Sequence, residues 1–489
     1  MRFLYIDIDT LRPDHLGCYG YHRNTSPNID KIAENGTVFT QAYTSDAPCL
    51  PSRASLFTGK FGIHSGIVGH GGTAADLRVM GKERGFFDQR IMNEFWIHKL
   101  RQAGFYTASI SPFAERHGAH WFYAGWNEMF NPGKQGHEIA DDIYFYAEKW
   151  LNEHAGEDDW MLHVNFWDPH TPYRTPKSFG NPFKDEPPPS WLTQEIIDEQ
   201  RNSYGPHSAR EIHGFKSHAS FKRAFPRIDI TEITSLDDFK TWIDAYDTGI
   251  RYADHYVGKI VSLLKEHEIF EDTLIMVSAD HGESQGELNV YGDHGTADHF
   301  VNRVPLIVKW PRKEWEPQYD NFIYTNDMAA TILDGVNARV PKAWDGESFL
   351  KEIENGKDFG RDFLVISQNA WSCQRSVRFE DWILIRSYHT GLKNFPEYML
   401  FDLEEDYHML NNLAEDRPKV LNKGVKLLEQ WHEDMMKTSD SRVDPMWTVI
   451  REGGPSHTRG ELNKYLRRLK RTGREEMIEV IKERNEAYE

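Results

Sequence analysis

Cys49 begins a short run, Cys-Leu-Pro-Ser-Arg, whose residue types and spacing could support covalent chemistry. Pro48 and Pro51 restrict the backbone on either side of it, and residues 52–58 are typical of a capped helix start. We therefore expect Cys49 at or just before a helix N-terminus, where backbone N–H groups favour an anion. Arg53, one turn along, should lie on the same face. A buried structural cysteine is the alternative interpretation.

Four other segments carry acids or imidazoles that could hold a metal ion or move a proton. Asp9 directly follows a first apolar run, and the pair Asp280-His281 follows a much later one. His170 stands in a turn that two prolines make rigid, and His294 stands between glycines in Gly-Asp-His-Gly. Alone, each is modest support for a site, since a carboxylate after a strand is often only a helix cap.

The charge balance limits the classes of partner. The 489 residues include 57 basic and 76 acidic side chains, a net charge of −19, which argues against general nucleic-acid or anionic-membrane binding. A local basic pocket could still take an anionic substrate. Three cysteines give no disulfide framework. No leader-like segment precedes the first apolar run and no run approaches the ~18 apolar residues of a membrane span, so we expect a cytoplasmic protein.

Apolar runs alternate with helical patterns along the first part of the chain. This alternation predicts an α/β fold with a mostly parallel central sheet sandwiched by helices, and ligands gather at the carboxyl ends of such strands. The expected strands are residues 3–8, 105–110, 160–167, 273–277 and 304–310. The expected helices are residues 26–35, 95–103, 140–153 and 240–267.

Two changes in pattern suggest further organisation. Residues 174–240 are rich in Pro, Asn, Ser and charge, which predicts an insertion or lid over the site. From residue 362 onward, short strand-like runs are followed by helical patterns. We therefore expect a catalytic domain over residues 1–361 and a smaller C-terminal α+β subdomain with a small antiparallel sheet and helices over residues 362–489.

Taken together, these motifs resemble the type I, formylglycine-dependent sulfatase family of the alkaline phosphatase superfamily. The resemblance covers most of the chain, from Cys-x-Pro-Ser-Arg through the segments 168–173 and 280–283 to Leu-Phe-Asp-Leu at 400–403. It implies an alkaline phosphatase-like fold. It also implies that a formylglycine-generating or sulfatase-maturating enzyme oxidises Cys49 to formylglycine, whose hydrate attacks the sulfur of a sulfate ester.

The resemblance also implies roles for the surrounding residues. Asp9, Asp280 and His281 match metal ligands, joined by the modified Cys49. His170 matches the histidine that protonates the leaving alcohol. Arg53, on the same helix face as residue 49, should hold the hydrate and the oxygens on the metal side. We expect one divalent cation, Ca²⁺ first, with Mn²⁺ or Zn²⁺ as alternatives because His281 supplies a nitrogen ligand.

The chain departs from the family pattern at several positions. Where many members have two adjacent aspartates after the first strand, this chain has one, so Asp7 is a reserve ligand or a buried carboxylate behind the ligands. His294 stands where a sulfate-gripping lysine is expected. Arg116 or His117 could replace a missing Lys-x-His, and His70 could contact the substrate.

The favoured function is hydrolysis of a sulfate ester, with a small sulfated carbohydrate as the expected substrate. Aromatic residues near the expected site support a sugar, because their rings stack on pyranoses; they are Trp121, Tyr123, Trp126, Trp167 and Tyr173. A phosphonate monoester or phosphodiester hydrolase of the same superfamily is the nearest alternative. A catalytically inactive binding protein on this fold is the alternative from another class.

Overall fold

An eight-stranded sheet is the framework of the larger part of the molecule, and the computed structural model describes residues 1–77 and 93–485. In their order across the sheet, the strands are β12 (Gln318–Tyr319), β2 (Thr37–Phe39), β11 (Leu306–Lys309), β8 (Thr273–Ser278), β1 (Arg2–Ile8), β7 (Trp160–Phe166), β5 (Tyr106–Ile110) and β6 (Glu128–Phe130). β1 pairs in parallel with both β7 and β8, whereas β11 runs antiparallel to β8 and β2. The carboxyl ends of β1, β7 and β8 therefore meet at one edge of the sheet.

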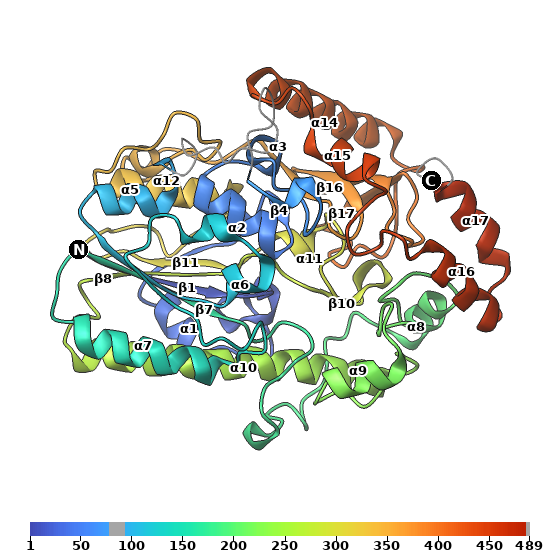
Figure 1. The fold of residues 1–489 in the computed structure, drawn as a ribbon, viewed down its shortest axis with the longest axis horizontal. Coiled ribbons are helices and arrows are strands. Elements are labelled where there is room, and N and C mark those ends of the chain that lie inside the picture. The colour runs from blue at the N-terminus through green and yellow to red at the C-terminus, as the bar shows by residue number, and fades with distance from the viewer. Residues whose placement is uncertain (78–92, 486–489) are drawn as a thin grey trace.

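The side chains of β1 show why the sheet lies between two layers of helices. Leu4, Ile6 and Ile8 pack into the core on one face, and Phe3 and Tyr5 pack into the core on the other. The first face is covered by α1 (Pro27–Ala33), α7 (Ala140–His154) and α10 (Leu236–Glu266). The second is covered by α2 (Cys49–Thr58), α5 (Trp96–Gln102) and α12 (Thr325–Gly335), as Figure 1 shows.

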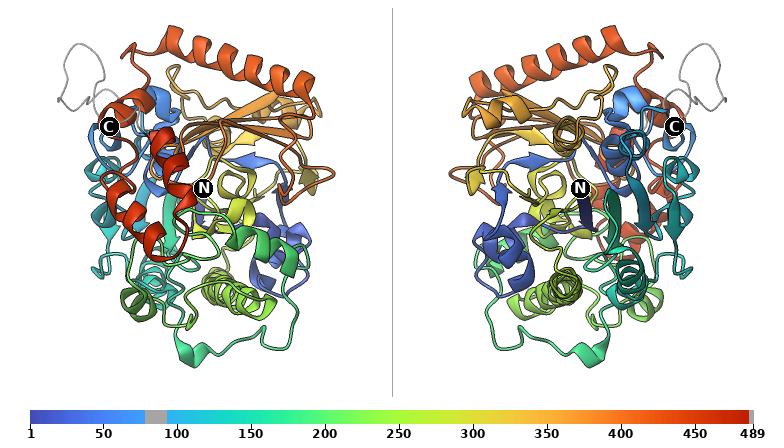
Figure 2. Two further views of the ribbon diagram at one scale, coloured as in Figure 1. Left: turned by 90° about the vertical axis from the view of Figure 1, so that its right-hand side faces the viewer. Right: turned by 90° about the vertical axis from the view of Figure 1, so that its left-hand side faces the viewer.

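A second, five-stranded sheet is built mostly from the C-terminal part of the chain. Its strands, in order, are β17 (Tyr398–Asp402), β16 (Trp382–His389), β15 (Cys373–Phe379), β14 (Phe363–Gln368) and β4 (Asp46–Ala47). The long helix α14 (Pro418–Thr438) covers one face (Figure 2). β4 pairs in parallel with β14 and ends just before Cys49, so this sheet is joined directly to the start of α2.

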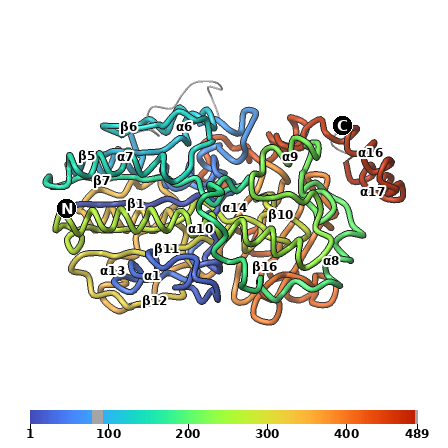
Figure 3. The backbone as a smooth tube through the Cα atoms, turned by 90° about the horizontal axis from the view of Figure 1, so that it is seen from below, coloured from blue at the N-terminus to red at the C-terminus, as the bar shows by residue number. Residues whose placement is uncertain are grey.

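Further helices and short strands belong to neither of these two sheets. The segment 174–240 holds η5 (Lys177–Phe179), α8 (Gln194–Arg201) and α9 (His218–Ala224), joined by irregular backbone. The C-terminal helices α15 (Pro445–Arg451), α16 (Leu462–Arg471) and α17 (Glu476–Asn485) follow α14. Figures 1 and 3 place α16 and α17 at the end of the molecule opposite the N-terminus. Helix α6 (Phe113–His117) follows β5, and β9 (Ser284–Gln285) and β10 (Tyr291–Asp293) form a separate two-stranded sheet.

The predicted fold class is confirmed, with one difference in strand direction. The predicted strand at 304–310 forms as β11, but it runs antiparallel to β8 rather than continuing the parallel sheet. The domain boundary at 361 and the lid function of 174–240 stay predictions. Among the described residues, no helix combines the length and the apolar character that crossing a membrane requires.

A buried ion pair joins the loop after β1 to the segment between β9 and β10. The Arg12 guanidinium donates to both carboxylate oxygens of Glu287, at 2.9 and 3.1 Å, and also to Asp14. Burial alone would raise the pKa of Glu287, but Arg12 outweighs it and holds that pKa at about 2. The ionised carboxylate therefore contributes to stability at neutral pH.

Glu287→Gln should lower the free energy of unfolding at pH 7 by about 2 kcal/mol, because it removes a buried charge-assisted contact. Since the folded-state pKa lies below the usual value, this contribution is present above about pH 4.5 and is lost as the pH falls towards about 2. Urea unfolding of wild type and variant across this range measures the difference, with the exposed Glu153→Gln as control. If the difference in the free energy of unfolding between wild type and variant stays constant down to pH 2, the lowered pKa of Glu287 is contradicted.

Candidate functional site

Helix α2 presents Cys49 and Arg53 toward the carboxyl edge of the main sheet. Cys49 is its first residue, as expected, and the helix is buried along its whole length rather than amphipathic. Pro51 lies in the first turn, where a backbone N–H has no partner within the helix, so the missing donor costs nothing. Ser52 donates through Oγ to the backbone carbonyl of Asp280 at 2.5 Å, which fixes α2 against the loop after β8.

Arg53 contacts three buried carboxylates that come from two parallel strands. Its Nε donates to Asp7 Oδ2 at 3.0 Å, and its Nη1 donates to Asp9 Oδ2 at 3.1 Å and Asp280 Oδ2 at 2.5 Å. The guanidinium also lies over the ring of Phe113 at 4.9 Å. A planar group with several fixed donors suits this role better than a lysine would. Arg53 thus holds the acids at the ends of β1 and β8 in one cluster.

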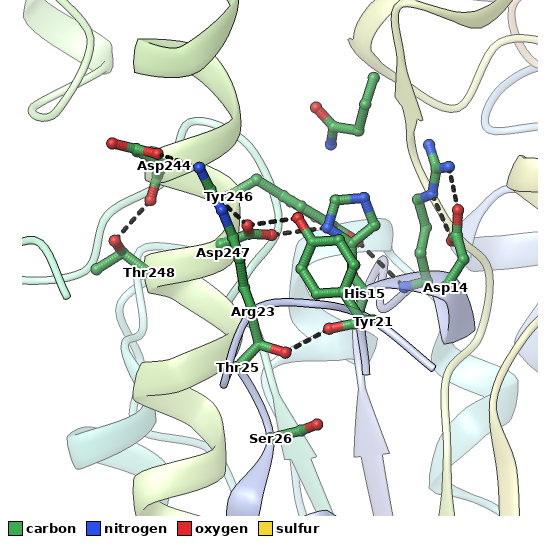
Figure 4. A network of polar contacts seen from close by, with 12 residues as sticks. Asp14, His15, Tyr21, Arg23, Thr25, Ser26, Asp244, Tyr246, Asp247 and Thr248 are labelled. Atoms are coloured by element: carbon green, nitrogen blue, oxygen red, sulfur yellow. Dashed lines mark hydrogen bonds and ion pairs between the residues drawn. The ribbon is translucent and has the colours of Figure 1, made fainter. Parts of the chain in front are cut away.

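Helix α10 fixes the loop that places Asp9. Tyr246 donates through its hydroxyl to the backbone carbonyl of Thr10 at 2.7 Å and holds this residue at a φ of 57°, a conformation that β-branched residues avoid. The adjacent Asp247 accepts from three side chains of the same loop (Figure 4), namely His15, Tyr21 and Arg23 at 2.7–2.8 Å. The turn after β1 is therefore held from outside the site.

Asp280 and His281 lie against the side chain of residue 49. His281 Nε2 is 3.2 Å from Cys49 Sγ, while its Nδ1 donates to the Gly282 carbonyl at 2.7 Å. This hydrogen bond keeps the ring proton on Nδ1, so the lone pair of Nε2 is free to bind a metal ion. Burial first, and then Asp9 and Asp280, raise the pKa of the Cys49 thiol well above its usual range. In the absence of a bound cation, burial and the two acids thus favour the neutral form of the Cys49 thiol.

The residues at this point fit a divalent cation. Ligand atoms of Asp9, Cys49, Asp280 and His281 all lie within 4.8 Å of one another, and all four residues are buried. Asp9 Oδ1 is buried without a hydrogen-bond partner among the described residues. Burial and the neighbouring Asp280 raise the pKa of Asp9 well above its usual range, despite Arg53. A cation at this point would satisfy the unpaired oxygen and offset the excess negative charge.

A cavity of about 1050 Å³ opens from Cys49 to the surface. Its described lining contains one carboxylate, Asp293, against four cationic side chains, which are Arg116, Arg174, Lys216 and Arg223. It also contains eight histidines, which are His70, His117, His137, His170, His207, His213, His294 and His457. In a chain of net charge −19, such a lining favours an anionic ligand over a cationic one.

His170 and His294 lie together beside the acidic cluster. His170 Nε2 is 4.0 Å from Asp9 Oδ1, and its Nδ1 donates to the Thr171 carbonyl at 2.5 Å. The ring centroid of His294 is 4.5 Å from that of His281 and 5.4 Å from that of His170. Burial lowers the pKa of both residues well below the usual value, with Arg116 adding to the effect at His170 and His281 at His294. An anion in the cavity would raise both pKa values again.

His70 and His117 lie on another wall of the cavity, with a histidine that the sequence did not suggest. His70 Nε2 accepts from the Leu50 amide at 3.4 Å, and its Nδ1 is 2.9 Å from His457 Nε2. His117 Nε2 is buried without a hydrogen-bond partner among the described residues. His457 lies beyond α15, so the C-terminal part of the chain reaches the cavity.

The structure brings the sequence-predicted site residues together and shows where the other expectations differ. Asp7 lies behind the ligand cluster, where it contacts Arg53 and His163 instead of the possible metal position. The aromatics expected to face a sugar do not line the described part of the cavity; Trp167 instead lies beneath Arg116 and stacks on His170. Arg174, Lys216 and His457 were missed, because no recognisable motif surrounds them.

Comparison with known proteins identifies the family. The sulfatase profile matches residues 2–338, well over half of the chain, so the chain belongs to the sulfatase family. A second profile, that of the C-terminal region of N-sulphoglucosamine sulphohydrolase, matches residues 292–438. The family and enzyme class predicted from the sequence are thereby confirmed.

Among curated relatives, the choline-sulfatase of Rhizobium meliloti is 25% identical over 441 residues, covering 80% of this chain and 78% of the relative. PehA of Trinickia caryophylli, a multifunctional alkaline phosphatase superfamily protein, is 24% identical, covering 80% and 86%. Among solved structures, the phosphonate monoester hydrolase SpPMH of Silicibacter pomeroyi has a TM-score of 0.67 at 20% identity, covering 90% of this chain and 96% of that one. A structure in complex with D-glucosamine-2-N,6-O-disulfate has a TM-score of 0.68 at 17% identity, covering 90% and 99%. These structural likenesses show the fold.

If the acidic cluster binds a divalent cation, adding Ca²⁺ or Mn²⁺ to chelator-treated protein should raise the melting temperature by about 3 °C or more. Asp280→Asn should abolish this shift, because it removes a charged ligand. Differential scanning calorimetry measures the shift, and Asp334→Asn, a half-buried carboxylate outside the site, is the matched control. An unchanged shift in Asp280→Asn would place the ion elsewhere.

Proposed function

We propose that this protein hydrolyses sulfate esters with a formylglycine made from Cys49 by a formylglycine-generating enzyme. The observation that carries the proposal is the contact of residue 49 with His281 at the head of a cationic cavity, beside two buried carboxylates.

The residues around position 49 can each take part in one step of sulfate ester hydrolysis. One hydroxyl of the hydrate at residue 49 attacks sulfur, and the bond from sulfur to the alcohol oxygen breaks. Protonated His170 donates from Nε2 to that oxygen, while His294 and Arg116 hold the sulfate. The attacking hydroxyl releases its proton to solvent as it bonds to sulfur. The second hydroxyl then passes its proton to His170, which is thereby reprotonated, as its carbon releases sulfate and the aldehyde re-forms. Water restores the hydrate, so one water is consumed for each alcohol and sulfate formed.

Asp9, Asp280, His281 and the modified residue 49 would hold one divalent cation, which lowers the pKa of the attacking hydroxyl. Two carboxylates suit Ca²⁺, and the imidazole of His281 also allows Mn²⁺ or Zn²⁺. Arg53 would keep Asp9 and Asp280 in place through its Nη1, and Asp7 contacts Arg53 Nε.

A sulfated carbohydrate is the substrate class that we propose. The cavity is cationic and large enough for a sugar unit, and Trp371 and Phe215 supply aromatic surface in its wall. The match to the N-sulphoglucosamine sulphohydrolase profile and the likeness to a structure that binds a glucosamine disulfate support this choice.

A second candidate is hydrolysis of phosphonate monoesters or phosphodiesters. The fold is as close to that of SpPMH as to that of the structure in complex with the glucosamine disulfate, and PehA is named as multifunctional. Rates of the mature enzyme on 4-nitrophenyl sulfate, a phenyl phosphonate monoester and a phosphodiester separate the two. We expect the highest kcat/KM on the sulfate; a higher value on the phosphonate would assign the second function.

Cys49→Ala should reduce kcat/KM by more than about a thousandfold, because it removes the covalent nucleophile, and should change the free energy of unfolding by about 1 kcal/mol or less. Mass spectrometry of the residue-49 peptide from the native host should show formylglycine. Unmodified thiol in a host with an active maturation enzyme would favour a binding protein, and activity retained in Cys49→Ala would remove the covalent mechanism.

His170→Ala should slow sulfate esters of alkyl alcohols about a hundredfold or more, and activated aryl sulfates about tenfold or less. The difference arises because only a poor leaving group needs the proton. Steady-state kcat/KM on both substrates tests this, with the exposed His120→Ala as control. Equal losses on the two substrates would exclude His170 as the general acid.

A further inference from the structure

The C-terminal helices form a second cavity against the 174–240 segment, although residues 439–485 lie beyond both family matches. Glu211, only 2% exposed, accepts from the Tyr465 hydroxyl at 2.6 Å and from Arg474 Nη2 at 2.8 Å. The Tyr465 hydroxyl also accepts from the Gly205 amide at 2.7 Å, and an apolar cluster including Tyr204 and Leu469 packs beside it. The helices are therefore fixed in place by buried contacts.

This second cavity has a volume of about 640 Å³ and a strongly cationic lining. Its five cationic side chains are Arg210, Lys216, Arg468, Arg471 and Arg474. The two carboxylates in the lining are already engaged, Glu211 with Arg474 and Glu232 with Arg201 at 2.9 Å.

Several of these cations lack partners among the described residues. The side chains of Arg210 and Arg471 form no hydrogen bond or ion pair with the described residues. Arg474 is 3% exposed, and its Nη1 is buried without a partner. A buried guanidinium nitrogen without an acceptor is costly unless a ligand supplies one.

The second cavity adjoins the cavity that opens from Cys49. His213 and Lys216 line both. The cavity that opens from Cys49 already has the volume of a site for a sizeable small molecule. The volume of the second cavity therefore comes in addition to what one sulfated sugar unit needs. The acidic surface of the protein repels polyanions at long range, and guanidinium groups in a pocket can reverse this repulsion locally and bind sulfate or carboxylate with paired donors.

We propose that this second cavity is an anion subsite, which binds a second negatively charged group of the substrate whose sulfate ester lies at Cys49. The inference rests on the proposed function and narrows its substrate class to carbohydrates of more than one unit with at least two anionic groups. The second group is a sulfate or a carboxylate, since the same donors suit both.

The test compares Arg210→Gln/Arg471→Gln with the wild-type enzyme. Arg467→Gln is the matched control, because Arg467 lies on the same helix α16, is exposed and does not line the cavity. The probes are tetrasaccharides of one backbone that carry one sulfate, two sulfates, or one sulfate and one carboxylate. Calorimetry gives each Kd, and release of inorganic sulfate is measured separately.

We expect the double variant to bind the doubly charged tetrasaccharides about tenfold or more weakly, and the singly sulfated one about as tightly as wild type. Arg467→Gln should bind every probe with the same Kd as wild type. Added salt should reduce the difference in Kd between the doubly charged and the singly sulfated tetrasaccharides. The two doubly charged probes show which second group is preferred.

Equal affinities of the double variant and wild type, or equal weakening on all probes, would overturn the subsite. Selective weakening without sulfate release from any probe would leave the subsite intact and overturn the proposed function. If the double variant fails to fold by circular dichroism, Arg471→Gln alone repeats the comparison, since this exposed side chain has no described partner to lose.

Discussion

The contact of Arg53 with Asp7, Asp9 and Asp280 is the constraint on which the rest of the site depends. Three carboxylates this close in a buried setting repel one another strongly, and one guanidinium offsets only part of that repulsion. The pKa values show the imbalance: that of Asp7, beside Arg53 and His163, is lowered, whereas that of Asp9 is raised. The cluster is therefore arranged for a further positive charge, on the side where Cys49 and His281 lie.

The second sheet matters because it holds two parts of this site. β4 pairs with β14 immediately before Cys49, and Gln368 at the end of β14 donates to the His294 carbonyl at 2.5 Å. The position of residue 49 and that of His294 are thus coupled through the C-terminal subdomain. Together with His457, this coupling explains why residues far in sequence from Asp9 and Asp280 still shape the cavity.

The sequence was most informative where a local motif carries the chemistry. Cys49 and Arg53 could be placed on one helix face, and Asp9 and Asp280 at strand ends, because strand and helix periodicity depend on nearby residues. Lys216, Arg174 and His457 could not be found, because their place in the cavity depends on the path of irregular loops. The prediction that aromatic residues near position 121 face a sugar was wrong for a related reason. Composition does not distinguish a core tryptophan from one in a binding site.

The most direct test of this account is a crystal structure of the formylglycine-containing enzyme grown with saturating Ca²⁺ or Mn²⁺. We expect one ion bonded to oxygens of Asp9 and Asp280, to His281 Nε2 and to an oxygen of residue 49. Clear density for the same side chains, with the carboxylates still paired only with Arg53 and no ion between them, would contradict it.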